Sequence, residues 1–171
     1  MGNQQERLFS WFAGILDGEG SISVQVYTLP DGRVRLTPFV MIVNTDLGIL
    51  EGCVEALRAI GVTYNRWKKP DTEWQNDKSR PCLAIRVDGA KKVRPVLDII
   101  TPYLRSVKRG NAEKILQYLD SRKVRGLKRD RLGQLQRVAY SRAEIELISS
   151  VRSHKRAKSS EAICRAPNVI G

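Results

Sequence analysis

Two carboxylates at the end of a predicted helix are the residues in this sequence best suited to chemistry. The segment FAGILDGEG, residues 12–20, ends with Asp17 and Glu19 alternating with Gly18 and Gly20. The partial negative charge at a helix C-terminus disfavours carboxylates there, so we expect a cation to join them. A few oxygen ligands suit Mg²⁺, which keeps several waters and takes phosphate oxygens as further ligands. Such a site could activate water and stabilise the leaving oxygen in phosphodiester hydrolysis.

Small residues on the same helix predict a close neighbour. Ala13 and Gly14 precede Gly18 by five and four positions, and small residues at such spacings let the backbone of a second helix approach closely. If that helix belongs to a second copy of the chain, two Glu19 carboxylates meet at one end of the helix pair. The segment therefore suggests a pair of metal sites at a helix interface.

The other reactive side chains argue against several alternative chemistries. The 171-residue chain has one histidine, His154, and three cysteines that form no CxxC pair. A histidine base, a multi-histidine metal centre, a disulfide framework and a zinc site are therefore not indicated. We expect Cys53 and Cys82 to be small buried hydrophobic residues. Catalysis would then depend on carboxylates, lysines or a bound metal.

The charge distribution indicates a polyanionic partner. The net charge is +12; residues 1–100 carry 13 Lys and Arg against 12 Asp and Glu, whereas residues 101–171 carry 17 against 6. Such a basic part is attracted to nucleic acid, although a generic basic surface like that of ribosomal proteins would give the same composition. With 42% hydrophobic residues and no signal peptide or long apolar run, we expect a globular protein of the cytoplasm or an organelle matrix.

Apolar spacing predicts the elements that must position the carboxylates. The predicted order is helix, two strands, helix, two strands and three helices, over residues 6–16, 21–27, 33–43, 47–60, 63–69, 80–87, 91–104, 110–122 and 140–158. Gly18 and Gly20 are expected to end the first helix, and Pro95 to lie in a first helical turn. Pro38 marks either a bulge or an edge, so the register of its strand is open. The order is typical of one α+β domain with helices on one face of an antiparallel sheet.

The uncovered face of that sheet is the predicted nucleic-acid surface. Its donors, acceptors and one aromatic ring suit the reading of base edges in a major groove, although antiparallel sheets usually show a polar face to water. The residues expected on this face are Ser21, Ser23, Gln25, Tyr27, Arg66, Lys68, Arg80 and Arg86. Further DNA contacts are expected from Arg33, Arg35, Tyr64 and Arg109. The basic connector after residue 121 should hold flanking phosphates through Arg122, Lys123, Arg125, Lys128, Arg129 and Arg131.

Taken with the strand that follows it, FAGILDGEG resembles the motif of LAGLIDADG homing endonucleases. The match includes Ala13, Gly14, Ile15, Asp17 and Gly20, with Glu19 as the last acid, and extends through the order of elements to about Ser121. The resemblance implies an αββαββα fold with a curved, antiparallel four-stranded sheet and extra C-terminal helices. One motif copy, without an internal repeat, implies in this family a homodimer acting on a near-palindromic site.

The resemblance also assigns roles to individual residues. Glu19 resembles the metal-binding catalytic acid, with the Gly18 carbonyl as a co-ligand, and Asp17 a structural acid that ties down a helix end or a neighbouring backbone. Asn44 and Thr45 are the candidates for holding active-site water, and Lys108, with Arg109 second, for the basic residue. The arginine of some family members near the second helix is missing, since Ile49 stands there. Residues expected at the dimer interface are Phe12, Ala13, Gly14, Asp17 and Gly18.

The resulting hypothesis is a site-specific double-strand DNA endonuclease. It would be an intron-encoded homing enzyme that uses Mg²⁺, with Mn²⁺ as a substitute, as a homodimer. The alternatives are a non-catalytic nucleic-acid binder of the same fold, either an RNA maturase or a transcription factor, and a generic basic RNA-binding protein. Residues 1–121 are expected to form the endonuclease core, 122–158 a basic helical extension and 159–171 a flexible tail.

Overall fold

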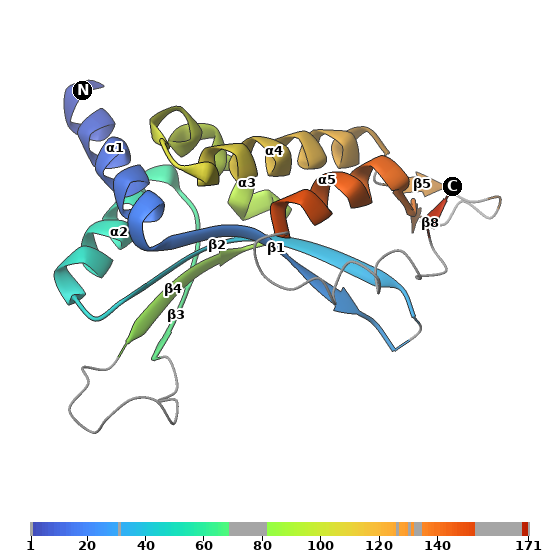
Figure 1. The fold of residues 1–171 in the computed structure, drawn as a ribbon, viewed down its shortest axis with the longest axis horizontal. Helices are drawn as coiled ribbons and strands as arrows, with labels where there is room; N and C mark the ends of the chain where they lie inside the picture. The colour runs from blue at the N-terminus through green and yellow to red at the C-terminus, as the bar shows by residue number, and fades with distance from the viewer. Residues whose placement is uncertain are drawn as a thin grey trace.

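An antiparallel four-stranded sheet carries a layer of helices on one face and leaves its concave face uncovered (Figure 1). The computed structural model describes residues 2–30, 32–68, 82–125, 127–129, 131, 135–152 and 169–170. The strands lie in the order β1-β2-β4-β3. The elements up to β4 are α1 (Gly2–Glu19), β1 (Gly20–Thr28), β2 (Val34–Asn44), α2 (Leu47–Ile60), β3 (Asn65–Lys68) and β4 (Leu83–Asp88). The predicted α+β class and order of elements are confirmed.

The rest of the chain adds helices to the covered face and small two-stranded sheets near the C-terminus. These elements are α3 (Ala90–Ile100), the 3₁₀ helix η1 (Thr101–Tyr103), α4 (Val107–Arg125), β5 (Leu127–Arg129), β6 (Leu135–Arg137), β7 (Tyr140–Ser141), α5 (Arg142–Arg152) and β8 (Val169–Ile170). One core cluster joins residues of the helix layer, including Ile148 of α5, to the inner side of the sheet. Helix α4 continues past residue 121, so the expected division of the chain there does not coincide with the end of an element.

Helix α1 is longer than predicted and continues through Gly18 to Glu19. The prediction that Gly18 ends it is wrong, since glycine costs a helix about 1 kcal/mol without breaking it. The chain leaves the helix at Gly20, where a Cβ atom would lie 2.5 Å from Leu16 Cδ2 and 2.8 Å from Leu16 Cα. The absent side chain therefore lets the helix pass directly into β1.

Strand β2 keeps one alternation throughout, which settles the register that the sequence left open. Leu36, Pro38, Val40 and Ile42 are all on the buried side, and the pairing with β1 runs without a bulge. The carbonyl of Pro38 accepts a hydrogen bond from Gly89 N–H (2.9 Å), one residue beyond the end of the β2–β4 pairing at Phe39 and Asp88. Pro38 is tolerated because its missing N–H faces an edge.

Strand β3 has the opposite register from the one expected. Asn65 and Trp67 lie opposite Arg86 and Ala84, whereas Arg66 lies opposite the buried Ile85. Arg66 and the backbone position of Lys68 therefore belong to the helix side of this edge strand, and the prediction that they share the uncovered face is wrong. Residues 69–81, between β3 and β4, are outside the described residues, and a connection of this length does not fix the register from sequence.

The helix boundaries show which local signals were reliable. Asp46 caps α2 by accepting hydrogen bonds from Gly48 and Ile49, and Gly61, with φ 79°, ends it, so the helix has the predicted bounds 47–60. Pro95 lies inside α3, beyond its first turn, so that prediction is wrong. Cys53 is buried, and burial, with the nearby Glu19, raises the pKa of its thiol to about 12. Cys82 is half-buried rather than buried.

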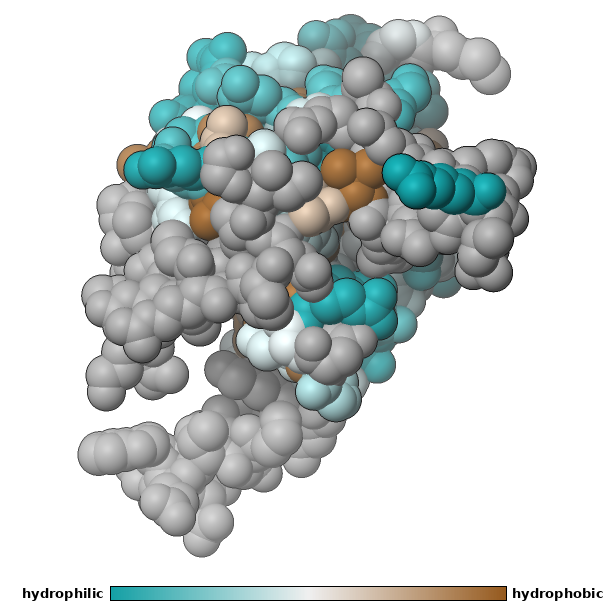
Figure 2. Space-filling view, turned by 90° about the vertical axis from the view of Figure 1, so that its right-hand side faces the viewer, coloured by the Kyte–Doolittle hydropathy of each residue, from teal (hydrophilic) through white to brown (hydrophobic). Residues whose placement is uncertain are grey.

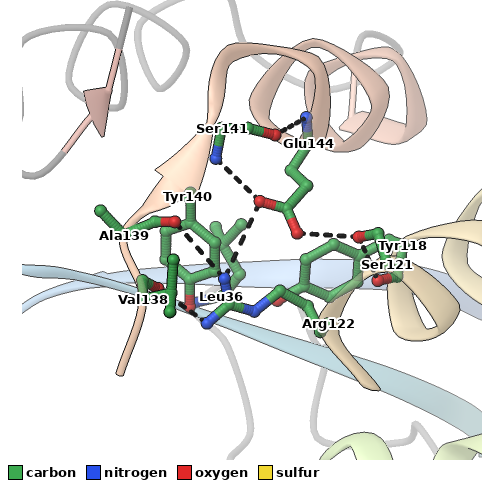
Figure 3. Close-up of polar contacts among 9 residues, drawn as sticks. All are labelled: Leu36, Tyr118, Ser121, Arg122, Val138, Ala139, Tyr140, Ser141 and Glu144. Carbon is green, nitrogen blue, oxygen red and sulfur yellow. Dashed lines mark hydrogen bonds and ion pairs between the residues drawn. The ribbon is translucent and has the colours of Figure 1, made fainter. Parts of the chain in front are cut away.

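The end of the molecule near the C-terminus presents mainly hydrophilic surface among the described residues, with smaller hydrophobic areas between (Figure 2). Beneath it, Glu144 is 4% exposed. Its carboxylate accepts hydrogen bonds from Ser141 N–H and the Ser121 hydroxyl, both at 2.8 Å, and lies 3.8 Å from Arg122 (Figure 3). Ser141 Oγ in turn accepts from Glu144 N–H (3.3 Å), which completes a capping box at the start of α5.

We expect Glu144→Gln to lower the free energy of unfolding by about 1–3 kcal/mol at neutral pH. Burial raises the pKa of Glu144, but hydrogen bonds from Ser141 and Ser121 and the charge of Arg122 outweigh it, so its pKa lies below the usual value. The stabilisation is therefore present above the unfolded-state pKa of about 4.3 and is lost as the pH falls through the lower folded-state value. In urea unfolding, the difference in free energy of unfolding between the variant and the wild type should shrink as the pH falls through the acid range. Glu146→Gln, which removes an exposed carboxylate of the same helix, should change stability little at any pH; a constant deficit for Glu144→Gln would contradict this account.

Candidate active site

The candidate site is built where α1 ends beside the first residues of β1. Glu19 is the last helical residue and is exposed. The last carbonyl groups of a helix lack partners within it, so the Gly18 carbonyl lies among oxygens that can bind a cation. Among the residues that the structure describes, no ion pair involves Glu19. Its carboxylate is thus available for a ligand.

Asn44, at the end of β2, lies next to that carboxylate. Its Nδ2 donates a hydrogen bond to Glu19 Oε2, and its Oδ1 accepts one from Asp46 N–H (2.8 Å). The second bond fixes the side-chain amide so that its donor group faces Glu19. Thr45, the other candidate for this role, is exposed and has no such bond. Of the two residues, the structure brings Asn44 to Glu19.

Asp17 bonds to a neighbouring backbone, as expected from the sequence. Its carboxylate accepts hydrogen bonds from Arg105 N–H (2.6 Å) and from both the N–H (3.4 Å) and hydroxyl (2.6 Å) of Ser106. Burial raises the pKa of Asp17, but these hydrogen bonds and the nearby Lys108 outweigh it and hold that pKa below the usual value. Asp17 therefore ties the end of α1 to the segment before α4.

Lys108 completes the same attachment from α4. Its Nζ donates hydrogen bonds to the carbonyls of Leu16 and Asp17, both at 2.7 Å. A cation at a helix C-terminus is stabilised by the helix dipole. Lys108 therefore supplies part of the positive charge that was expected beside the two carboxylates at the end of α1. Burial lowers the pKa of Lys108, and Asp17 offsets part of this effect. Arg109 points elsewhere and pairs with Glu113 (3.1 Å).

Asp17→Asn should lower the free energy of unfolding by about 1–3 kcal/mol, because three donors at residues 105 and 106 lose a charged acceptor. Urea denaturation at neutral pH measures the change. Glu113→Gln is the matched control, since it removes a carboxylate from an exposed ion pair and such pairs contribute at most about 1 kcal/mol. Equal stability losses in the two variants would show that Asp17 does not fasten the helix end.

The donor set fits a hydrated magnesium ion better than an all-protein metal site. The described part of the chain contains no group of three or more His, Cys, Asp and Glu side chains that could hold a metal. One carboxylate, one helix-end carbonyl and an adjacent amide leave most coordination positions to water and to phosphate oxygens, which is the ordinary environment of Mg²⁺. The residues present therefore fit the cation that the motif implied.

The uncovered face of the sheet adjoins this site through β1. Ser21, Ser23 and Gln25 project from β1 on the side opposite the buried Ile22 and Val24, as predicted, and Tyr27 is 43% exposed. These side chains are joined on β2 and β4 by Arg35, Thr37, Phe39, Arg86 and Asp88. The face is thus polar at its β1 side and carries both rings and guanidinium groups.

Arg86 is held in one orientation on this face. Its Nη2 donates to Gln25 Oε1 (2.6 Å), its Nε donates to Asp88 Oδ1 (2.7 Å), and its Cζ lies 4.1 Å from the centre of the Phe39 ring. Three contacts from three strands leave the guanidinium little freedom. An arginine fixed in this way can present its remaining donors to a ligand at a low entropy cost.

Several other predicted DNA-binding residues lie elsewhere. Tyr64, which was expected to contact DNA, is half-buried and packs against the hydrophobic core. Arg122 bonds to the carbonyls of Val138 (2.9 Å) and Ala139 (3.5 Å), which makes it internal. Arg33 is exposed just before β2. Arg80 is outside the described residues, and so are the side chains of Lys68, Arg125, Lys128 and Arg129.

Sequence reasoning missed two residues of the uncovered face on β3. Asn65 and Trp67 line a hollow of about 630 Å³ with Tyr27, Arg35 and Arg86. Trp67 is 38% exposed, and an exposed tryptophan on a polar surface is a common binding residue. The sequence signal for Trp67 was its position between the basic residues Arg66 and Lys68. It was overlooked because β3 was expected in the opposite register, which placed Trp67 on the helix side.

The residues predicted at a dimer interface differ in their exposure. Phe12 and Ala13 are 0% exposed within the chain's own core, so their side chains are not available to a partner. Gly14 and Gly18 are exposed, and a Cβ atom added at either would meet nothing within 4 Å. The exposed stripe of α1 is therefore formed by Trp11, Gly14 and Gly18.

Comparison with known proteins gives matches to solved structures. No protein-family model and no curated protein sequence matches the chain. Among solved structures, it is similar to the homing endonuclease I-CvuI in complex with its target, with a TM-score of 0.66 and 16% identity over 95% of this chain and 93% of that one. It is also similar to the archaeal intron-encoded homing endonuclease I-Vdi141I complexed with DNA, with a TM-score of 0.61 and 15% identity over 94% of each chain.

A third match shows the extent of the shared unit. The LAGLIDADG homing endonuclease I-GzeII, in complex with a DNA target, matches 95% of this chain but 50% of its own, with a TM-score of 0.60 and 17% identity. Over nearly its whole length, the chain therefore has the fold of LAGLIDADG homing endonucleases, as the motif indicated. Within the described residues, no helix is long and apolar enough to cross a membrane.

Proposed function

We propose that this protein is a site-specific double-strand DNA endonuclease that hydrolyses phosphodiester bonds with Mg²⁺. The observation that carries the proposal is Glu19: an exposed carboxylate at the end of α1, without an ion-pair partner among the described residues, beside the polar uncovered face. The fold supports it, because the solved structures of this fold include endonucleases bound to DNA. The match to I-Vdi141I, an intron-encoded homing endonuclease, supports a homing role.

The proposed roles of the chain's own residues follow from their positions. Ser21, Ser23, Gln25 and Arg86 would read base edges, while cations at the rim hold phosphates. Asn44 orients the Glu19 carboxylate. The hydrogen bonds of Asp17 and Lys108 hold the end of α1, and with it Glu19, in a fixed position relative to α4. When bound by Glu19 and the Gly18 carbonyl, Mg²⁺ would polarise the scissile phosphate and an attacking water.

We further propose that the enzyme acts as a homodimer on a pseudo-palindromic target. One chain supplies one Glu19, and cutting both DNA strands requires two. The exposed glycines of α1 give a second copy of the helix room to approach, and the match to half of I-GzeII supports two such units as the working assembly. A two-fold symmetric protein pairs naturally with a symmetric site.

A cleavage assay tests this function directly. Purified protein is incubated with Mg²⁺ and a plasmid carrying the DNA that flanks its own gene, joined as it would be without the insertion. We expect a single double-strand cut at the junction with Mg²⁺ and no cut when a chelator is present. Cutting should also occur when Mn²⁺ replaces Mg²⁺. Tight binding to the junction without cleavage in either metal would contradict the nuclease proposal and leave a non-catalytic binder of the same fold.

A further inference from the structure

The outer part of β2 forms a free edge that opens beside the helix layer. The β2–β4 pairing ends at Phe39 and Asp88, whereas β2 continues outward to Val34 paired with β1. Leu36 N–H, which has no strand partner there, donates to the Tyr140 hydroxyl (3.2 Å). Beyond the end of β4, the sheet is therefore bordered by side chains of the helix layer.

A cavity of about 560 Å³ lies at this edge, between β2, the first turn of α3 and the end of α4. We call it the β2-edge pocket. Its lining includes five cationic side chains, and none of the described residues that line it is acidic: Arg35, Lys91, Arg94, Arg122 and Lys123. A pocket lined by one sign of charge concentrates counter-ions.

Two of the five cations are already neutralised, which identifies the three that remain. Arg94 pairs with Asp120 (2.7 Å) and Asp98 (3.4 Å), and Arg122 is engaged by Glu144 and two carbonyls. In the part of the chain that the structure describes, Arg35, Lys91 and Lys123 make no ion pair, and all three are exposed. These three cations are available to an anionic ligand.

The start of α3 adds backbone donors to the same pocket. Gly89 precedes the helix with φ 89°, and no side chain caps it. The N–H groups of Lys92 and Val93 bond to the Gly89 carbonyl, so those of Ala90 and Lys91 are the donors left at the helix N-terminus. Such donors, together with the helix dipole, favour a phosphate group. The pocket thus combines side-chain cations with helix-end amides.

The wall behind these groups is made of packed and ion-paired side chains. Arg122 lies 4.8 Å from the centre of the Tyr140 ring, Tyr118 lies beside the same ring, and buried Glu144 holds Arg122 from behind (Figure 3). Arg122 therefore supports the pocket, and its removal would damage the wall. Lys91 and Lys123 are at the surface and can be changed without disturbing it.

The pocket is continuous with the uncovered face of the sheet. Arg35 and Thr37 line both the β2-edge pocket and the hollow that contains Trp67 and Arg86. A ligand that lies along the uncovered face can therefore cross the free edge of β2 and reach the start of α3. A DNA duplex carries phosphates at regular intervals beside the bases that such a face would read.

We propose that the β2-edge pocket binds a backbone phosphate of the same DNA duplex whose bases face the sheet. Lys91 and Lys123 pair with its oxygens, and the amides of Ala90 and Lys91 donate to it. The inference rests on the proposed DNA-binding function. It places a sequence-independent contact at the flank of the target, where it adds affinity and fixes register without reading bases.

The test compares two double variants that lose the same charge. Lys91→Ala/Lys123→Ala empties the pocket of free lysines, and Lys92→Ala/Lys114→Ala removes two lysines of the same two helices that do not line it. The affinity for a non-cognate duplex is measured by fluorescence anisotropy at several salt concentrations. The slope of log K against log[salt] is negative, and each lost phosphate contact reduces its magnitude by about 0.9. We expect a decrease of about one per protomer in the pocket variant and the wild-type slope in the control.

A second readout tests the pocket without DNA. Inorganic pyrophosphate should shift the amide NMR signals of Ala90 and Lys91 in the wild type and not in Lys91→Ala/Lys123→Ala. Equal salt slopes in the two double variants, or no amide shift in the wild type, would overturn the inference while leaving DNA binding intact. A wild type that binds no duplex at all would instead overturn the proposed function, and the inference with it.

Discussion

Glu19→Gln should abolish cleavage while leaving DNA binding and folding unchanged. In the proposed site the Glu19 carboxylate is the one charged metal ligand of each chain, so its loss should cost several kcal/mol in the transition state, or a rate loss on the order of a thousandfold. The glutamine carbonyl can still accept the hydrogen bond from Asn44 Nδ2 that the carboxylate accepts now. Single-turnover cleavage of the junction DNA at saturating protein isolates this effect from binding.

The control for this substitution lies on the same helix. Glu6→Gln removes one negative charge from an exposed position of α1, far along the helix from the candidate site, and should cut at the wild-type rate. Binding of both variants to the same duplex, measured with a chelator present, should match that of the wild type. Wild-type cleavage by Glu19→Gln would remove Glu19 from the reaction and favour the non-catalytic alternative.

The sequence was most informative where one side of an element is buried and the other is not. The alternation of β1 and the apolar spacing of α2 predicted these elements nearly to the residue, because Ile22 and Val24 can face only one way and Asp46 satisfies the first amides of a helix that begins where the spacing begins. The end of α1 was less predictable. What ends that helix is the contact of Gly20 with Leu16, a tertiary fit that no local propensity reveals.

Strand β3 shows why the uncovered face could not be predicted completely. Its alternation of basic residues with Asn65 and Trp67 is compatible with either register, and the choice depends on pairing with β4, from which residues 69–82 separate it in the chain. The motif itself pointed to the candidate site, since Glu19, Asp17 and Lys108 were all singled out from it, and the structure places Asp17 and Lys108 at the same end of α1 as Glu19. The internal use of Lys108 at the helix carbonyls depends on how α4 packs, which the spacing of residues did not contain.

Gly14→Leu should separate assembly from folding. Leucine is a better helix former than glycine by roughly 0.7 kcal/mol, and a Cβ atom at position 14 meets nothing within 4 Å in the same chain. The protomer should therefore unfold at an equal or higher urea concentration. If a second α1 packs against this glycine, the added side chain costs about 1–3 kcal/mol, which raises the dimer dissociation constant by about 5- to 150-fold. Sedimentation across a protein dilution series measures that constant.

Gly110→Leu distinguishes the lost interface from a general effect of leucine. Gly110 lies in α4, and a Cβ atom there also meets nothing within 4 Å, so the substitution should give a similar gain in helix stability without changing the dimer. Cleavage should then diverge: Gly14→Leu loses double-strand cutting at protein concentrations where the wild type is dimeric and regains it at higher concentration. In the proposed dimer each Glu19 carboxylate serves one DNA strand, so a monomeric Gly14→Leu protein that cuts both strands at the wild-type rate would contradict the paired-helix arrangement.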